Sequence, residues 1–96
     1  MSAAPATAPL EIAESQPAKI DGSWRVLLFN DQVHTFQEVI LLLVLATGFD
    51  LKRCVEITEQ AHVTGRAEVI RADEATAEKV AKVLIDGGLI AAVRPV

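Results

Sequence analysis

Three helix starts, each followed by an apolar stripe, constrain the fold of this chain more than any other feature. Thr35 and Glu38 form a capping box, in which a hydroxyl and a carboxylate satisfy free backbone N–H groups at a helix start. Asp50 and Asp73 fit the N-cap position of two further helices. The predicted helices run from about Phe36 to Thr47, from Asp50 to near His62, and from Asp73 to the Gly87-Gly88 pair.

Strand patterns fill the segments between these helices. From Trp24 to Asn30 the side chains alternate, and the second face is apolar enough to predict partial burial of both faces. Arg66 to Ala72 alternates less regularly because Ile70 falls on the polar side, so we expect a half-exposed strand. A last strand is predicted from Leu89 to Val93, ended by Pro95. The order β-α-α-β-α-β predicts an α+β two-layer sandwich, a small three-stranded sheet with three helices on one face.

Length and composition limit the size of any site. The chain has 96 residues and 51% hydrophobic residues, but only three Phe, one Trp and no Tyr, so the core must be built from Val, Leu, Ile and Ala. A chain of this size buries only about 60–65% of its extended surface, which argues against a large enzyme cleft. Proline-interrupted, Ala-rich sequence predicts a disordered arm at residues 1–22, without the pattern of a targeting segment, ahead of one domain at 23–96.

Charge, hydropathy and cysteine content limit the classes of partner that we expect. Nine basic and thirteen acidic residues give a net charge of −4, which argues against a nucleic-acid partner. The most apolar run, Val39 to Ala46, is far shorter than the roughly 20 residues that span a bilayer, so no membrane partner is expected. The single Cys54 cannot form an internal disulfide. We therefore expect a cytoplasmic monomer without cofactor or metal.

Three polar residues stand where the predicted elements end. Asn30 and Asp31 close the first strand, and His62 closes the second helix. Taken singly, Asn-Asp is ordinary turn chemistry, and a histidine at the end of an apolar stripe is more often a half-buried residue bonded to backbone. Taken together, they offer an amide, a carboxylate and an imidazole to a cationic group, since an ammonium has three donors and no acceptor. The set predicts a binding site for an amine.

The order and spacing of these motifs resemble the ClpS family of adaptors, which hand substrates to the Clp ATP-dependent proteases. The resemblance covers Trp24 to Val93, and the Asn-Asp-x-x-His-Thr-Phe wording is closer to the plastid and cyanobacterial branch. It rests on four motifs: Asn30-Asp31, Thr35-Phe36-x-x-Val39, His62-x-x-Gly65-x-Ala67 and Ala77-Glu78.

The resemblance implies a non-enzymatic adaptor that binds N-degron substrates, through a free α-amino group and a bulky apolar first residue, and delivers them to a Clp-type AAA+ ATPase. The residues that it implies for the α-amino group are Asn30, Asp31, Gln32 and His62. Those that it implies for the side-chain pocket are Phe36, Val39, Thr58, Ala61 and Leu89. The flexible N-terminal extension that the family's ATPase engages corresponds to the predicted arm by composition alone.

The chain departs from the common family pattern at several positions. Gln32 replaces a second Asp and adds no charge, so we expect a weaker hold on the ammonium. Thr58 and Ala61 replace residues that are more often Met and Val, which predicts a wider and slightly more polar pocket. On the third helix, Ala75 and Val80 stand where better-known members carry a Glu and a Lys that meet the ATPase.

Three alternatives stay open at this point. One is an interaction module resembling the ribosomal stalk C-terminal domain, although the net charge of −4 differs from the Lys-rich surface of that domain. Another is a Clp regulator without N-degron binding. The third is an enzyme or metal site built from Asp31, His34, Cys54 and His62. Cys54 and His62 lie roughly 12 Å apart along one helix, too far for a nucleophile–base hydrogen bond, and no zinc-type spacing is present.

Overall fold

A computed structural model describes residues 22–96, and its elements follow the predicted order. The elements are β2 (Trp24–Phe29), α2 (Phe36–Thr47), α3 (Leu51–Thr64), β3 (Arg66–Ala72), α4 (Glu74–Asp86) and β4 (Ile90–Pro95). The predicted arm at residues 1–22 lies, apart from Gly22, outside the described residues.

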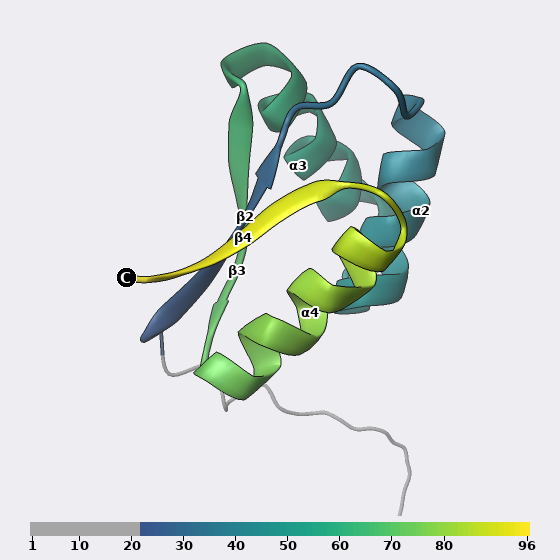
Figure 1. Cartoon of the computed structure of the whole chain (residues 1–96). Helices are drawn as coiled ribbons and strands as arrows, with labels where there is room; N and C mark the ends of the chain where they lie inside the picture. The colour runs from purple at the N-terminus through teal and green to yellow at the C-terminus, as the bar shows by residue number, and fades with distance from the viewer. Residues whose placement is uncertain (1–21) are drawn as a thin grey trace, which may run out of the picture.

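The three strands form one antiparallel sheet in the order β3-β2-β4, so the first strand lies in the centre. Figure 1 shows the three helices on one side of this sheet, while no helix of the described chain covers its other side. The predicted α+β two-layer sandwich is confirmed.

The caps that the sequence predicted fix where the helices begin. The Thr35 hydroxyl accepts from the Glu38 N–H at 3.2 Å, and the Glu38 carboxylate accepts from the Thr35 N–H at 2.9 Å. Asp50 and Asp73 cap α3 and α4 with one side-chain bond each, because their carboxylates accept from the N–H groups of Arg53 at 2.9 Å and Thr76 at 3.3 Å. Helix α3 runs two residues beyond the predicted end at His62, because the left-handed C-cap is Gly65, with φ 96°. His62 therefore lies inside the last turn.

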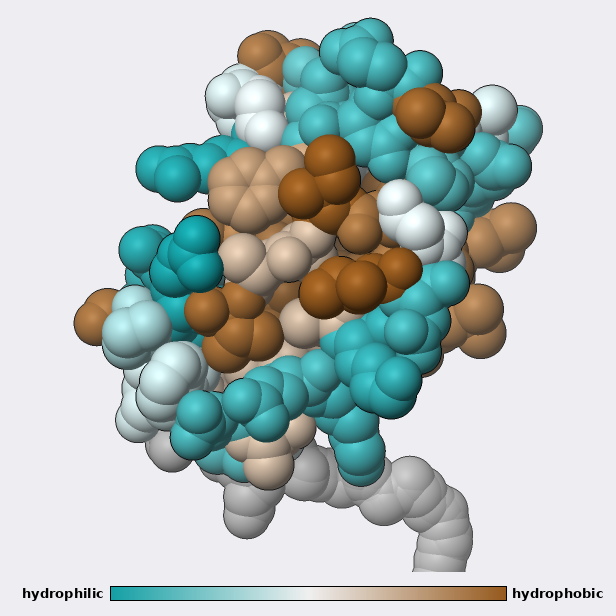
Figure 2. All heavy atoms as spheres, in the orientation of Figure 1, coloured by the Kyte–Doolittle hydropathy of each residue, from teal (hydrophilic) through white to brown (hydrophobic). Residues whose placement is uncertain are grey.

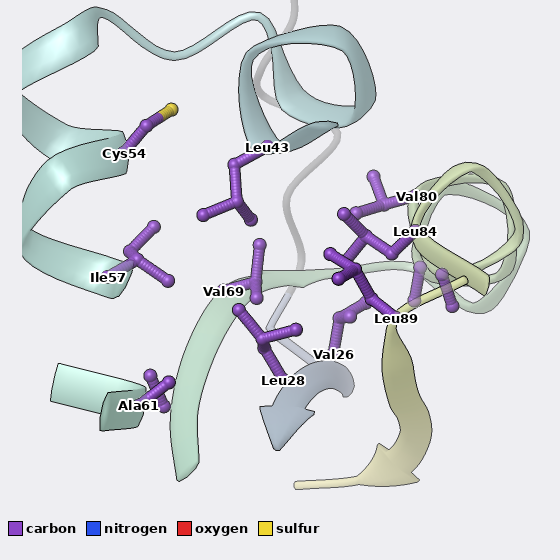
Figure 3. Packing of buried hydrophobic residues seen from close by; sticks show 13 residues of the cluster. Val26, Leu28, Leu43, Cys54, Ile57, Ala61, Val69, Val80, Leu84 and Leu89 are labelled. Atoms are coloured by element: carbon purple, nitrogen blue, oxygen red, sulfur yellow. The ribbon is translucent and has the colours of Figure 1, made fainter. Parts of the chain in front are cut away.

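The core fills the space between the sheet and the helices. Figure 3 shows Val26 and Leu28 of β2 pointing toward side chains of all three helices. Except for the sulfur of Cys54, the largest fully buried side chains are aliphatic, as composition predicted: Leu28, Leu43, Ile57, Leu84, Val26 and Val69.

Asn30 and Leu89, the predicted end of the first strand and start of the last, each lie one residue outside the strand, and two further details differ from the prediction. Val26 pairs with Ile70 and Leu27 with Glu68, so Val69 is the extra residue of a β-bulge. The bulge turns Ile70 onto the core face, where it is half-buried, and the prediction that it lies on the polar side was wrong. Pro95 does not end the last strand but belongs to it, opposite Trp24. An edge strand tolerates this proline, which has no N–H to donate.

The surface carries both apolar and hydrophilic residues. In the view of Figure 2, apolar side chains gather in the middle of the face, where β4 crosses in Figure 1, and hydrophilic residues surround them. Within residues 22–96 no helix is both long and apolar enough to cross a membrane.

Candidate functional site

One pocket of about 230 Å³ lies where the end of β2, the start of α2, the end of α3 and the residue before β4 meet. All nine residues expected at the site line it: Asn30, Asp31, Gln32, Phe36, Val39, Thr58, Ala61, His62 and Leu89. Four further residues, which the sequence did not indicate for the site, complete the lining: Leu28, Phe29, His34 and Thr35. Residues far apart in the sequence thus share a single cavity.

A backbone hydrogen bond joins the two polar segments of the pocket. The N–H of Asn30, just after β2, donates to the carbonyl of Gly65 at 2.9 Å. Gly65 is the C-cap of α3, and the last turn of that helix carries His62. The side-chain amide of Asn30 has no hydrogen-bond partner within the described residues, so its oxygen is available as an acceptor.

An aromatic contact closes the pocket between α2 and α3. The rings of Phe36 and His62 meet edge to face, with centroids 5.1 Å apart and planes at 74°. Phe36 is the first residue of α2, so the capping box that fixes the helix start at Thr35 also fixes the position of this ring. His62 is exposed, and among residues 22–96 nothing hydrogen-bonds its ring nitrogens.

Asp31 organises the loop between β2 and α2. Its Oδ1 accepts from the N–H groups of Val33 at 2.6 Å and His34 at 2.9 Å, and its Oδ2 accepts from His34 Nδ1 at 2.7 Å. The backbone N–H groups of His34 and Val33 hold the pKa of the Asp31 carboxyl below its usual 3.8. Asp31 thus places a negative charge beside the pocket, while both of its oxygens already accept bonds from its own loop.

His34 is, with Thr35, one of two polar lining residues that sequence reasoning left out of the predicted amine site. An ionised Asp31 can only accept, so Nδ1 of a neutral His34 carries the proton and Nε2 keeps its lone pair. A Cβ on Gly88 would lie 3.1 Å from Cε1 and Nε2 of this ring, so the turn before β4 packs closely against it. The signal available in the sequence was the pairing of Asp31 with a histidine three residues later.

The inner part of the pocket is formed by buried residues. Thr58, Ala61 and Leu89 are each exposed by no more than 4%. The Thr58 hydroxyl donates to the carbonyl of Cys54 at 2.8 Å, so its hydrogen is already engaged. Thr58 therefore adds less polarity to the pocket than its residue type alone indicates, whereas the small Ala61 side chain leaves space. Gln32, at the opposite extreme, is exposed at the rim.

The third-helix positions differ in a way that the sequence did not reveal. Ala75 is exposed, but Val80 is only 5% exposed and belongs to the core. A side chain at position 80 cannot meet a partner. Glu74 and Lys79, each one position earlier, are both exposed on α4.

Features of a reactive or metal site are weak in the described part of the chain. Cys54 is fully buried, and burial raises the pKa of its thiol, which lowers its nucleophilicity. Within residues 22–96 no three His, Cys, Asp or Glu side chains group as metal ligands.

Comparisons with known proteins agree on one family. Residues 19–87 match the family model of the ATP-dependent Clp protease adaptor protein ClpS. A similar curated protein is the chloroplastic ATP-dependent Clp protease adapter protein CLPS1 of Arabidopsis thaliana, with 33% identity over 78 residues. The match covers 80% of this chain and 49% of the relative, so the chain spans about half the length of that protein. The chloroplastic location is that of the relative, and a cytoplasmic location for this chain stays a prediction.

A solved structure has the same fold. Agrobacterium tumefaciens ClpS2 bound to L-phenylalaninamide matches with a TM-score of 0.70 over 78% of this chain and 99% of that one. The two sequences are 22% identical, so this likeness concerns the fold alone.

Proposed function

The chain belongs to the ClpS family of ATP-dependent Clp protease adaptor proteins, and on that premise we propose that its pocket binds the first residue of N-degron substrates. The observation that carries the proposal is the single cavity shared by all nine residues expected at the site. Such a substrate offers a free α-amino group and a bulky apolar first side chain, and the cavity has groups suited to each.

Three acceptors suit the ammonium. The amide oxygen of Asn30, a ring nitrogen of neutral His62 and Nε2 of His34 can each accept one of its three hydrogens. The ionised Asp31 contributes charge attraction without needing a direct hydrogen bond, because its oxygens already serve the loop. Gln32 adds a further acceptor at the rim. An acetylated N-terminus loses the positive charge and all but one of the donors that these groups would hold.

The apolar lining suits one side chain. A volume of about 230 Å³ is smaller than the roughly 300–1,000 Å³ of sites for drug-sized ligands, so the pocket fits a single large residue. Burying a Leu or Phe against Val39, Ala61 and Leu89 contributes about 1.5–3 kcal/mol. The liganded Agrobacterium protein, whose ligand is an amide of phenylalanine with a free amine, is consistent with such a preference.

Delivery to a Clp-type AAA+ ATPase requires a docking surface away from the pocket. The family resemblance gives a Glu and a Lys on the third helix this role, and burial excludes Val80 from it. Glu74 and Lys79 keep the same five-residue spacing one position earlier, and both are exposed. We assign the docking pair to these two residues.

Substitution of the proposed acceptors tests the ligand. Asn30→Ala and His62→Ala should each weaken binding of a labelled peptide starting with Leu by roughly tenfold, the loss of one charge-assisted hydrogen bond. Fluorescence anisotropy measures the affinities. Val63→Ala is the matched control, because Val63 neighbours His62 but is 79% exposed and does not line the pocket. Unchanged affinity in both acceptor variants would contradict the proposal and favour a Clp regulator without N-degron binding.

A further inference from the structure

The outer face of the sheet, opposite the helices, is unusually rich in arginine. Arg25 lies directly opposite Arg71 on β3 and Arg94 on β4, so three arginines form a row across the sheet. Directly opposed residues point to the same side, and Arg66, opposite Phe29, shares this side. We call these four residues the arginine face: Arg25, Arg66, Arg71 and Arg94. The chain has only one other arginine, Arg53.

The arginine face is not neutralised from within the described chain. Glu68 is its single acidic neighbour, and it bonds Arg71 through two contacts of 2.6 and 3.2 Å. Arg25 reaches the same carboxylate only at 3.9 Å, and its buried Nε has no hydrogen-bond partner. Within residues 22–96, Arg66 and Arg94 form no ion pair. Like charges directly opposite one another in a sheet are destabilising, so the row is unfavourable for folding alone.

The shape of this surface also favours a ligand. A shallow depression of about 330 Å³ lies at the edge of the face, lined by Arg25, Leu27, Gln60, Thr64, Arg66, Ala67 and Glu68. The side chain of Arg25 is 38% exposed, and Arg66, Arg71 and Arg94 are exposed. Figure 1 shows that no element of the described chain covers this side of the sheet. Guanidinium groups are therefore accessible beside a concave surface.

We propose that the arginine face docks a segment of a partner protein that carries closely spaced Asp or Glu residues. Neighbouring strands lie about 4.8 Å apart, so the three opposed arginines span roughly 10 Å. Carboxylates on alternate residues of an extended segment lie about 7 Å apart and can bond two of these guanidinium groups. The paired contacts between Arg71 and Glu68 are an example of this chemistry within the face.

Charge distribution favours an acidic protein segment over a nucleic acid. Apart from Glu68, every acidic residue of the described chain lies on the helices or in loops, and the whole chain carries −4. A long polyphosphate reaching past the narrow face would meet these carboxylates, whereas a short segment would not. Ile90 is 55% exposed on the same side and offers an apolar contact that suits a peptide.

The test uses the full chain and three labelled probes in fluorescence anisotropy. These are an N-acetylated peptide with alternating Asp and Glu, the same peptide with Asn and Gln, and a single-stranded oligonucleotide. Acetylation keeps the peptides out of the pocket proposed above. We expect the acidic peptide alone to bind, more weakly as salt is raised from about 50 to about 300 mM. The double variant R25Q/R94Q should weaken this binding by roughly tenfold.

The matched control is K52Q/K82Q, which also removes two positive charges, but from exposed positions on α3 and α4. It should change the affinity for the acidic peptide by less than about twofold. No binding of the acidic peptide, equal losses in both variants, equal binding of the Asn/Gln peptide or tighter binding of the oligonucleotide would each overturn the proposal. A fourth probe, a free-amine peptide starting with Leu and lacking carboxylates, reports on the pocket. If this fourth peptide fails to bind while the acidic peptide binds, the N-degron site is refuted and the proposal for the arginine face is unaffected.

Discussion

At the scale of single residues, Asp31 supports the pocket through its own loop. Its carboxylate accepts from two backbone N–H groups and from the His34 ring, so it fixes both the path of the chain into α2 and the orientation of an acceptor. A carboxylate committed in this way acts on a cationic ligand through its charge and through the positions of its neighbours. Asn30 and His62, in contrast, keep unbonded side-chain acceptors.

The hydrogen bonds of Asp31 predict a pH-dependent stability. Because the pKa of the folded state lies below the usual 3.8, ionised Asp31 stabilises the fold above that pH, and the contribution is lost as pH falls through the folded-state pKa. Asp31→Asn should therefore lower the Tm at pH 7, and the difference from the parent chain should shrink toward pH 2. Circular dichroism melts across this range measure both. A Tm difference that stays constant with pH would contradict the assigned role.

The residues of the site could be predicted from the sequence to an unequal degree. Asn30, Phe36 and His62 lie near the ends of elements whose caps can be recognised in the sequence. That they lie close together could therefore be predicted from the order of the elements. His34 could not be placed in the same way. Its position at the pocket depends on the Asp31 bond and on close packing against Gly88, which is remote in the sequence and carries no local signal for this contact.

At the scale of elements, the capping box of α2 links stability to the site. Thr35 and Glu38 satisfy one another's backbone N–H groups, and the helix that they start presents Phe36 and Val39 to the pocket. Thr35→Ala should cost about 1 kcal/mol of unfolding free energy. Urea unfolding followed by the single Trp24 measures it, with Gln37→Ala, an exposed first-turn position, as the control. An equal effect of the two substitutions would show that the cap contributes nothing of its own.

At this scale, element bounds could be predicted where neighbouring residues in the sequence determine them, and less well where strand pairing determines them. The bounds of α2 and β3 matched because a capping box and Gly48 mark the helix, while Gly65 and the N-cap Asp73 flank the strand. The bulge at Val69 and the inclusion of Pro95 in β4 depend on β2 as the shared partner, which no short stretch of β3 or β4 encodes. Single-strand alternation therefore misplaced Ile70.

At the scale of the whole molecule, arginines and acidic residues are unevenly distributed. The arginine face holds four of the five arginines on the bare side of the sheet (Figure 1), while every acidic residue of the described chain except Glu68 lies on the helices or in loops. The pocket lies at a third place, at the end of β2. The proposed sites for a substrate, a Clp ATPase and an acidic partner segment therefore involve different residues of one small domain.

The assignment of the ATPase docking pair predicts a separation of functions. The charge-reversed variant E74K/K79E should lose binding to a Clp ATPase by roughly tenfold or more, because both contacts become repulsive. Neither residue lines the pocket, so binding of a Leu-starting peptide should not change. Pull-down with the purified ATPase and peptide anisotropy measure the two. Full ATPase binding by the variant would place the docking surface elsewhere.

Recognition of a free N-terminal residue is the central claim, and one measurement tests it most directly. Peptides starting with Leu, Phe, Trp or Ala, each with a free or an acetylated N-terminus, are titrated with the full chain in fluorescence anisotropy. The pocket predicts binding of the free Leu, Phe and Trp peptides, at least about tenfold weaker binding of Ala, and loss of binding on acetylation. Equal binding of the free and acetylated forms, or no binding of any peptide, would contradict the claim.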